Sequence, residues 1–391
     1  MNSFALSPAT NRLFELSQAT VEYFLAHEPP TRRYLLKDCL PLGKVGAIIA
    51  PGGTGKSQFV LQLAISVATG LPLAKGAWEI GEPGGVLALF AEDDVEELHR
   101  RFRNTVNSLR QEVEVPNLSS LLKSRLFVRS MVAENNLMTY VEPIHKLLYR
   151  SDYVERLVCT AREVPNLRLI IIDPASRFRG GNENAAEDMT RFVEVLEYLS
   201  KETSATVLVV HHANKASMQG TEQTQSASRG SSAFSDGVRW QMNLSTMTKD
   251  EAKTYGIQED QRYLYLSATM TKNNYAAPQP PVFLQRLDGG VLVKAVLFDN
   301  EKREAQGIVL RIVEKIAASA ERFSVRSFEE SFGGKTNDFG IGEIALRGFV
   351  NQAINLGYLV KGSDKRGLLS ITELGKQILV LRTKADSAMT G

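Results

Sequence analysis

The chain has 391 residues, of which 43% are hydrophobic and 23% charged, with 46 Lys and Arg against 44 Asp and Glu. This length favours two domains or three, at roughly 100–200 residues each, and the composition excludes a disordered or collagen-like chain. No apolar run approaches the roughly 18 residues that a membrane span needs, and the first residues lack the pattern of a secretory signal. Two cysteines, Cys39 and Cys159, suggest neither a disulfide framework nor a zinc site. We therefore expect a cytoplasmic protein that binds no membrane.

The first two thirds of the chain alternate between strand-like and helix-like segments. A short helical arm is expected at about residues 9–27, before Pro29 and Pro30. Strands are then expected at residues 45–50, 85–90, 125–129, 167–172 and 206–210, and helices at 57–68, from 95, around 140–149 and at 184–201. Buried strands separated by helices indicate an α/β fold whose central sheet is mostly parallel and covered on both faces.

The remaining third changes character twice. Residues 214–236 are polar, and two strand candidates follow at residues 263–270 and 291–297. Helices are then expected at residues 302–320, 325–332 and 341–356, and a hairpin at residues 357–372, a pattern typical of a winged helix. With a boundary near residues 299–306, we predict an N-terminal helical arm (1–30), an α/β domain (31–300) and a winged-helix-like domain (301–391).

Residues 50–57 read APGGTGKS, the P-loop pattern with Ala50 in place of the usual first glycine. Glycines there let backbone N–H groups turn toward phosphate oxygens, and the following helix adds the positive end of its dipole. Lys56 would neutralise the β- and γ-phosphates, and the Ser57 hydroxyl would complete a Mg²⁺ shell. The alternative is a chance glycine-rich turn. We expect ATP and Mg²⁺ as ligands and take these residues as the nucleotide site: Gly52, Gly53, Thr54, Gly55, Lys56, Ser57 and Gln58.

Two further strands end in carboxylates. The strand LIIID ends at Asp173, at the carboxyl edge of the sheet, where it can hold Mg²⁺ through water; the alternative is an ordinary strand end at an Asp-Pro turn. The sequence AEDD follows a strand that we place beside the P-loop strand, and it offers Glu92 as the base that orients or deprotonates water. Asp93 or Asp94 also suits the N-cap of the next helix.

A pair of histidines, His211 and His212, follows the strand TVLVV. Successive strand residues point to opposite faces, so only one of them can face the γ-phosphate. A structural role is the ordinary alternative for such a pair. The order P-loop strand, Glu strand, Asp strand and His strand is that of a RecA-like P-loop NTPase core.

Several stretches of the chain resemble the RepA replicative helicases of broad-host-range plasmids. They include APGGTGKS, FAEDD, IIIDPASRF, VVHHANK and SASRGSSAFSDGVRWQ, and they span about residues 40–295. The resemblance implies a hexameric RecA-like ring that moves along single-stranded DNA and hydrolyses ATP between subunits. It also implies that Glu92 is the base, Asp173 the second metal-site carboxylate, His212 the γ-phosphate sensor, and Arg239 an arginine finger that enters the neighbouring site.

This role for Arg239 also has a physical basis. The P-loop lysine supplies positive charge on one side of the γ-phosphate, and an arginine from a neighbouring subunit can supply it on the other side. The alternative is an Arg stacked on Trp240 at a surface or an interface. Lys272 is a second candidate cation at the interface between subunits. Tyr275 is either a nucleotide-stacking or a packed aromatic residue.

DNA contacts are expected in two places. In a RecA-like ring the loop after the sensor strand faces the central channel, so Lys215 and Arg229 are candidates for phosphate contacts; a disordered connector is the alternative. The tail extends beyond the region of resemblance. Its third helix offers only Arg347, Asn351 and Gln352, whereas the hairpin tip offers Lys361, Lys365 and Arg366. Duplex DNA and a replication protein therefore remain alternative partners of the tail.

Together these features predict a DNA-dependent ATPase, a replicative helicase of a plasmid, phage or integrated mobile element. The competing hypothesis is a RecA-like ATPase that assembles on DNA, or loads another factor, under control of ATP and without unwinding. A pure switch can dispense with fast hydrolysis, so Glu92 and Arg239 separate the two.

Overall fold

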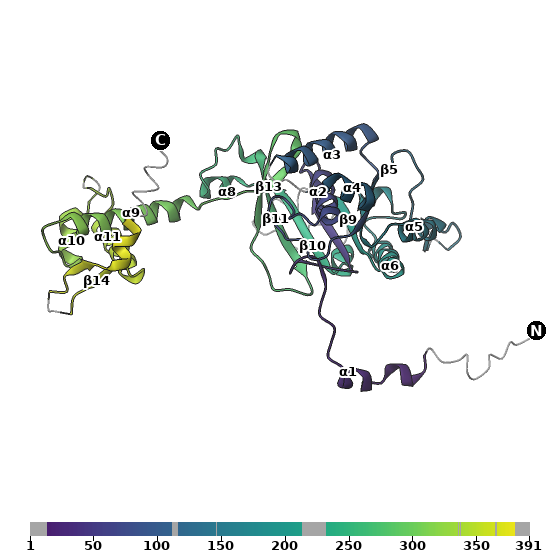
Figure 1. The fold of residues 1–391 in the computed structure, drawn as a ribbon, viewed down its shortest axis with the longest axis horizontal. Helices are drawn as coiled ribbons and strands as arrows, with labels where there is room; N and C mark the ends of the chain where they lie inside the picture. Colours follow the sequence, from purple (N-terminus) through teal and green to yellow (C-terminus); the bar gives the residue numbers. More distant parts are fainter. Residues whose placement is uncertain are drawn as a thin grey trace, which may run out of the picture. The chain divides into compact units, whose positions relative to one another are not determined.

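The computed structural model describes residues 14–111, 116–145, 147–212, 232–334, 336, 338–363 and 366–379. The chain divides into two compact units (Figure 1): one comprises Met1–Ser245 and Leu266–Ala295, and the other Thr246–Tyr265 and Val296–Gly391. Among the described residues, no helix has the length and apolar character needed to cross a membrane.

The first unit is built on one large mixed sheet, to which nine strands belong among the described residues. In spatial order they are β13 (Leu292–Lys294), β12 (Val282–Arg286), β11 (Tyr265–Asn273), β10 (Trp240–Thr246), β3 (Val45–Ala50), β9 (Thr206–His212), β8 (Leu167–Asp173), β4 (Gly85–Phe90) and β5 (Leu126–Ser130). The six strands from β10 to β5 are parallel, and β12 and β13 pair antiparallel. The expected α/β fold with a mostly parallel sheet is confirmed.

Helices cover both faces of this sheet (Figure 1). α2 (Lys56–Thr69), α3 (Val95–Arg110) and α4 (Leu118–Arg125) pack on one face, and α5 (Asp152–Arg162) and α6 (Ala186–Thr203) on the other. Alternate residues of β3 divide between two apolar cores, because Ile48 belongs to the first and Ala47 and Ile49 to the second. Burial on both faces explains why these strands are continuous apolar runs in the sequence.

The order of the strands corrects one expectation. The strand that carries Glu92, β4, does not adjoin the P-loop strand β3, because β9 and β8 lie between them. Glu92 still reaches the site, since β3, β9, β8 and β4 are parallel and all end at the same edge of the sheet. Strand adjacency is set by long-range pairing, which local sequence patterns do not encode.

Two predicted helices are wrong in whole or in part. Residues 140–149 form a hairpin of β6 (Thr139–Val141) and β7 (Leu148–Arg150). The arm contains a 3₁₀ turn, Leu16–Ala19, and a separate short helix α1 (Glu22–Ala26), because Thr20 between them is extended. The part of the expected arm before residue 14 lies outside the described residues. Before β3, a small ladder joins β1 (Tyr34–Leu36) and β2 (Leu40–Pro41).

The second unit contains the predicted three helices and hairpin. They are α9 (Asn300–Ala318), α10 (Val325–Phe332), α11 (Glu343–Asn355) and the antiparallel pair β14 (Leu359–Lys361) and β15 (Leu369–Ile371). Apolar residues from all of these elements form one core, with Ile312, Phe328 and Leu346 fully buried. The segment Thr246–Tyr265, with α8 (Lys249–Thr254), also belongs to this unit.

Candidate nucleotide site

The loop between β3 and α2 forms an open cradle. Gly53 and Gly55 have φ values of 76° and 97°, a left-handed conformation that favours glycine. A Cβ at Gly52 or Gly53 would meet no atom within 4 Å, so this side of the loop faces open space. Thr54 closes the turn, because its hydroxyl donates to the carbonyl of Pro51 at 2.9 Å. The first N–H groups of α2 have no partner within the helix and point toward this space.

Lys56 lies at the centre of the site and is only 7% exposed. Its Nζ donates to the Pro51 carbonyl at 2.9 Å and lies 3.3 Å from Nδ1 of His212. Burial lowers the pKa of Lys56, while the charges of Asp173 and Glu92 raise it. A buried ammonium beside a phosphate-binding loop can offset the negative charge of a bound triphosphate.

The two histidines have separate environments, as the alternation of a strand requires. His211 is buried, and its ring centroid lies 5.0 Å from that of Phe234. His212 is half-buried and faces Lys56 on one side and Glu92 on the other, with its Nε2 3.8 Å from the Glu92 carboxylate. Of the pair, His212 is the one at the P-loop.

Glu92 is accessible, with a side chain 43% exposed. Besides His212 it faces Arg177, whose Nε lies 3.7 Å away. Neighbouring carboxylates have other partners: Asp93 pairs with Arg101, and Asp94 accepts the N–H of Glu97 at 2.7 Å as the N-cap of α3. The capping role expected at Asp94 is confirmed, and Glu92 keeps its carboxylate at the open side of the site.

Asp173 ends β8 and is 3% exposed. Burial raises the pKa of Asp173 to about 7, against the lowering effects of the Ser57 hydroxyl, which donates to it, and of the Lys56 charge. One of its oxygens, Oδ2, is buried without a hydrogen-bond partner. A buried carboxylate oxygen that lacks a partner, beside a serine hydroxyl, is the donor set that a hydrated Mg²⁺ requires. The residues present fit the metal, and Ser57 and Asp173 would hold it.

Gln58 points away from the phosphate cradle. Its side chain is buried, and its Nε2 donates to the Thr105 hydroxyl of α3 at 2.9 Å and to Gln62 at 3.4 Å. Only the backbone N–H of Gln58, in the first turn of α2, remains as a candidate ligand. The side chain therefore anchors α2 to α3, a role that the sequence pattern did not indicate.

Arg239 lies at the opposite edge of the sheet from the P-loop of its own chain. Its N–H donates to the carbonyl of Val45, the first residue of β3, at 3.0 Å. The P-loop follows the last residue of β3, Ala50, roughly 16 Å further along the strand at about 3.3 Å per residue. The Arg239 side chain is 48% exposed and lies 3.9 Å from Glu197. Trp240 is fully buried, which rules out the alternative of an exposed Arg–Trp stack.

Lys272 and Tyr275 lie near Arg239. The Lys272 Nζ donates to the carbonyls of Ser235 and Asp236, at 2.8 and 2.7 Å, in the last turn of α7 (Ser232–Gly237). Burial lowers the pKa of Lys272, and the charge of Arg239 lowers it further. A hollow of about 490 Å³ beside them is lined by both Arg239 and Tyr275. The Tyr275 ring is covered by the Arg32 guanidinium at 4.6 Å.

The residues expected to contact DNA are only partly described. Lys215, Arg229 and Lys365 lie outside the described residues. Lys361, at the end of β14, and Arg366 are exposed. Arg347 on α11 instead pairs with the buried carboxylate of Glu329 on α10, through two of its nitrogens.

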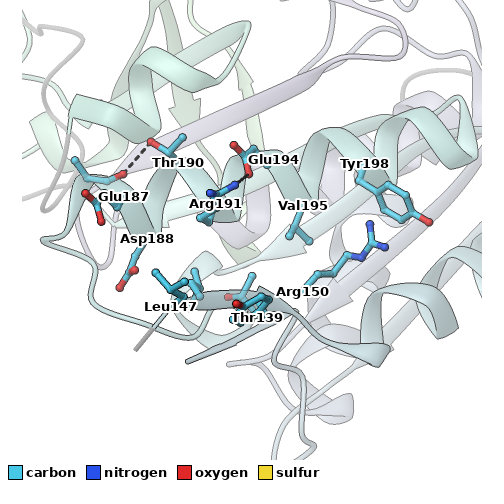
Figure 2. Close-up of a pocket in the computed structure, with 13 residues that line it drawn as sticks. Thr139, Leu147, Arg150, Glu187, Asp188, Thr190, Arg191, Glu194, Val195 and Tyr198 are labelled. Atoms are coloured by element: carbon cyan, nitrogen blue, oxygen red, sulfur yellow. Dashed lines mark hydrogen bonds and ion pairs between the residues drawn. The ribbon is translucent and has the colours of Figure 1, made fainter. Parts of the chain in front are cut away.

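A separate hollow of about 870 Å³ lies between the β6–β7 hairpin and α6 (Figure 2). Its arginines are paired: Arg150 lies 2.9 Å from Glu155 and covers the Tyr198 ring, and Arg191 lies 2.8 Å from Glu194. The figure shows Glu187 and Asp188 on the same side of it. None of the residues predicted from the sequence is among the described residues that line this hollow, and its mixed charges do not favour a phosphate ligand.

One residue at the P-loop was missed by sequence reasoning. The Arg286 guanidinium, from the last position of β12, donates to the Thr54 carbonyl at 2.7 Å. The segment QRLDGG carries no local signal for this contact, because 232 residues separate the two partners.

Comparisons with known proteins gave a similar solved structure and a family. The solved structure, whose title describes it as an ATPase domain, aligns with 65% of this chain and 85% of that chain, with 14% sequence identity and a TM-score of 0.45. A family model described as an AAA domain matches residues 10–218, which include the P-loop, Glu92, Asp173 and His212. Since this match covers more than half of the chain, the protein belongs to the AAA domain family.

Proposed function

We propose that this protein is an ATP-driven DNA helicase of the RepA type, which hydrolyses ATP between the subunits of a hexameric ring. One observation carries the proposal. Lys56, Glu92 and His212 meet at the carboxyl edge of the sheet, whereas Arg239 lies at the amino edge beside Val45. A site divided in this way is complete only when the amino edge of one subunit faces the P-loop of another.

The residues at the carboxyl edge divide the chemistry of ATP hydrolysis. Backbone N–H groups of the cradle and Lys56 bind the phosphates, and Mg²⁺ held by Ser57 and Asp173 would neutralise their charge. Glu92, accessible and close to His212, orients or deprotonates the attacking water. Arg239 of the neighbouring subunit stabilises the charge that develops on the γ-phosphate, and Lys272 supports it by fixing the end of α7.

His212 provides a path from the nucleotide to the DNA. It is the last residue of β9, and residues 213–231, which contain Lys215 and Arg229, follow directly in the chain. A change at the γ-phosphate that moves the His212 ring would act on the start of this segment. We place the contacts to single-stranded DNA there, through phosphates and without base readout.

The second unit is a winged-helix-like recruitment module in this proposal. Its exposed cations Lys361 and Arg366, with Lys365 between them in the chain, would contact the backbone of duplex DNA. α11 itself offers little positive charge to DNA, because its Arg347 pairs with Glu329. A replication protein is therefore the alternative partner, and the cations at the hairpin tip distinguish the two.

The decisive experiment combines turnover and unwinding. We expect ATP hydrolysis to rise steeply with single-stranded DNA, and a forked duplex to be unwound only with hydrolysable ATP. Electron microscopy with a non-hydrolysable ATP analogue should show closed rings. ATP-dependent DNA binding without unwinding, at a slow turnover that DNA does not stimulate, would instead support the competing hypothesis of an ATP-switched loader.

A further inference from the structure

We propose that Arg286 is a positioning residue for the triphosphate, which holds the P-loop in its cradle form and adds a second positive charge within the same subunit. The inference rests on the proposed function only in requiring that the P-loop binds a nucleotide. The contact that suggests it is the hydrogen bond from the Arg286 guanidinium to the carbonyl of Thr54, at 2.7 Å.

The contact lies at the most adaptable part of the loop. Thr54 stands between Gly53 and Gly55, both in the left-handed conformation. A Cβ at Gly55 would come within 3.2 Å of the Arg286 guanidinium, so the arginine lies directly against the backbone of the cradle. The backbone of a glycine-rich loop can adopt many conformations. A hydrogen bond from Arg286 to one carbonyl of the loop restricts these conformations before the ligand binds.

The arginine is itself held rigidly. It ends β12, and the β12–β13 hairpin is fixed to both helices beside the site. Gln62 of α2 exchanges two hydrogen bonds with the backbone of Leu292, both at 2.8 Å, and Asn104 of α3 donates to the carbonyl of Gly289 at 3.3 Å. A donor on such a support can orient the loop, because the hairpin is anchored to the helices independently of its contact with Thr54.

The charge of Arg286 is available to a ligand. Within the described parts of the chain, no carboxylate forms an ion pair with this half-buried guanidinium. Of its five N–H donors, one is used by Thr54. An arginine without an acidic partner beside a phosphate cradle has the geometry and charge to favour a bound polyphosphate, in addition to Lys56.

The test measures the affinities of ATP and of inorganic triphosphate for the full-length protein. Loss of one charge-assisted contact should weaken the binding of both ligands to Arg286→Ala by about tenfold. The KM for ATP should rise by a similar factor, while kcat stays within about threefold. Arg286→Lys, which keeps the charge, should recover part of the affinity, and it also serves if the alanine variant fails to fold. Lys294→Ala is the matched control, because Lys294 lies in the same hairpin and donates to a backbone carbonyl, that of Gly76, away from the P-loop.

Two results would overturn the inference: wild-type affinity for both ligands in Arg286→Ala, whether or not kcat falls, or a loss of affinity confined to ATP. A loss confined to ATP would assign the arginine to the nucleoside instead of the phosphates. These outcomes are separate from failure of the proposed function. If the wild-type protein binds neither ATP nor triphosphate, the nucleotide site itself is wrong, whereas normal binding by both wild type and variant contradicts the role of Arg286 alone.

Discussion

The Nζ of Lys56 lies 3.3 Å from Nδ1 of His212. An ammonium group only donates, so Nδ1 accepts and the ring proton belongs on Nε2, the nitrogen that faces Glu92 at 3.8 Å. Lys56, His212 and Glu92 therefore lie in a row of neighbouring polar side chains. A change of charge or protonation at one of them changes the electrostatic potential at the other two. A phosphate that draws Lys56 away from His212 would alter this row, which gives the histidine a physical basis for sensing the nucleotide.

Lys56→Ala should abolish ATP hydrolysis and leave the fold intact. The ammonium is buried among groups of the site and contributes to neither apolar core. We expect turnover near background, and a circular dichroism spectrum equal to that of the wild type. A variant that keeps more than a small fraction of its activity would show that the P-loop assignment is wrong.

Arg239→Ala should bind ATP almost normally and hydrolyse it slowly, because the residue lies at the far edge of its own sheet. An arginine finger contributes roughly 10³–10⁵ in rate in other P-loop NTPases. Lys201→Ala is a control, since this residue lines the same hollow without a proposed catalytic role.

Mixing tests the division of the site between subunits. Lys56→Ala subunits keep an intact Arg239, and Arg239→Ala subunits keep an intact P-loop. If the protein forms the proposed ring, mixed assemblies should therefore contain some complete sites. DNA-stimulated ATPase should return in the mixture. If subunit exchange is demonstrated and activity stays absent at every ratio, Arg239 does not act in trans.

Asp173→Asn should stabilise the nucleotide-free protein, and by more at pH 8 than at pH 5. Burial raises the pKa of Asp173 to about 7 from an unfolded value of 3.8, so the folded state prefers the protonated carboxyl. This preference contributes fully below the unfolded pKa and is lost as pH rises through about 7. The amide imitates the protonated form, and its advantage should grow over that range.

Thermal unfolding of Asp173→Asn and wild type in chelator, from pH 5 to pH 8, measures this effect. A difference that is constant with pH would show that Asp173 does not titrate in this range. The same variant should lose ATP hydrolysis with Mg²⁺, since an amide is a poorer ligand than a carboxylate.

Arg347→Ala should destabilise the second unit, because it leaves the buried carboxylate of Glu329 without its partner. Pairing with Arg347 lowers the pKa of Glu329. The stabilisation is therefore present above the unfolded pKa and is lost as pH falls through the lower folded value.

We expect a lower unfolding temperature for Arg347→Ala at pH 7, and a smaller difference from wild type as the medium becomes acidic. Replacing the carboxylate as well, in Arg347→Ala with Glu329→Gln, should recover part of the loss. Asn351→Ala is the exposed control on the same helix. An equal loss at all pH values would mean that packing of the Arg347 side chain, not its charge, stabilises the unit.

The sequence by itself determined the elements with strong local patterns. Residues 45–50, 85–90 and 325–332 form the predicted strands and helix with the predicted bounds, since unbroken apolar runs and the helical spacing of apolar residues are local properties. The P-loop was equally readable, because its geometry depends on glycines within eight residues. In contrast, residues 140–149 carry apolar residues without a clear period, and they form a hairpin through the pairing of residues 139–141 with residues 148–150.

Relations between distant residues were decided by the tertiary structure alone. The order of the strands placed β9 and β8 between the P-loop and Glu92, set Arg239 beside Val45, and brought Arg286 to Thr54 across 232 residues. The tertiary structure also shows that His212, and not His211, lies at the P-loop. The alternation of strand residues predicted that only one of the two could lie there, but not which one. Local propensity acts over a few residues, whereas strand pairing and core packing are cooperative over the whole unit, and the positions of Arg239 and Arg286 relative to the P-loop are set at that second level.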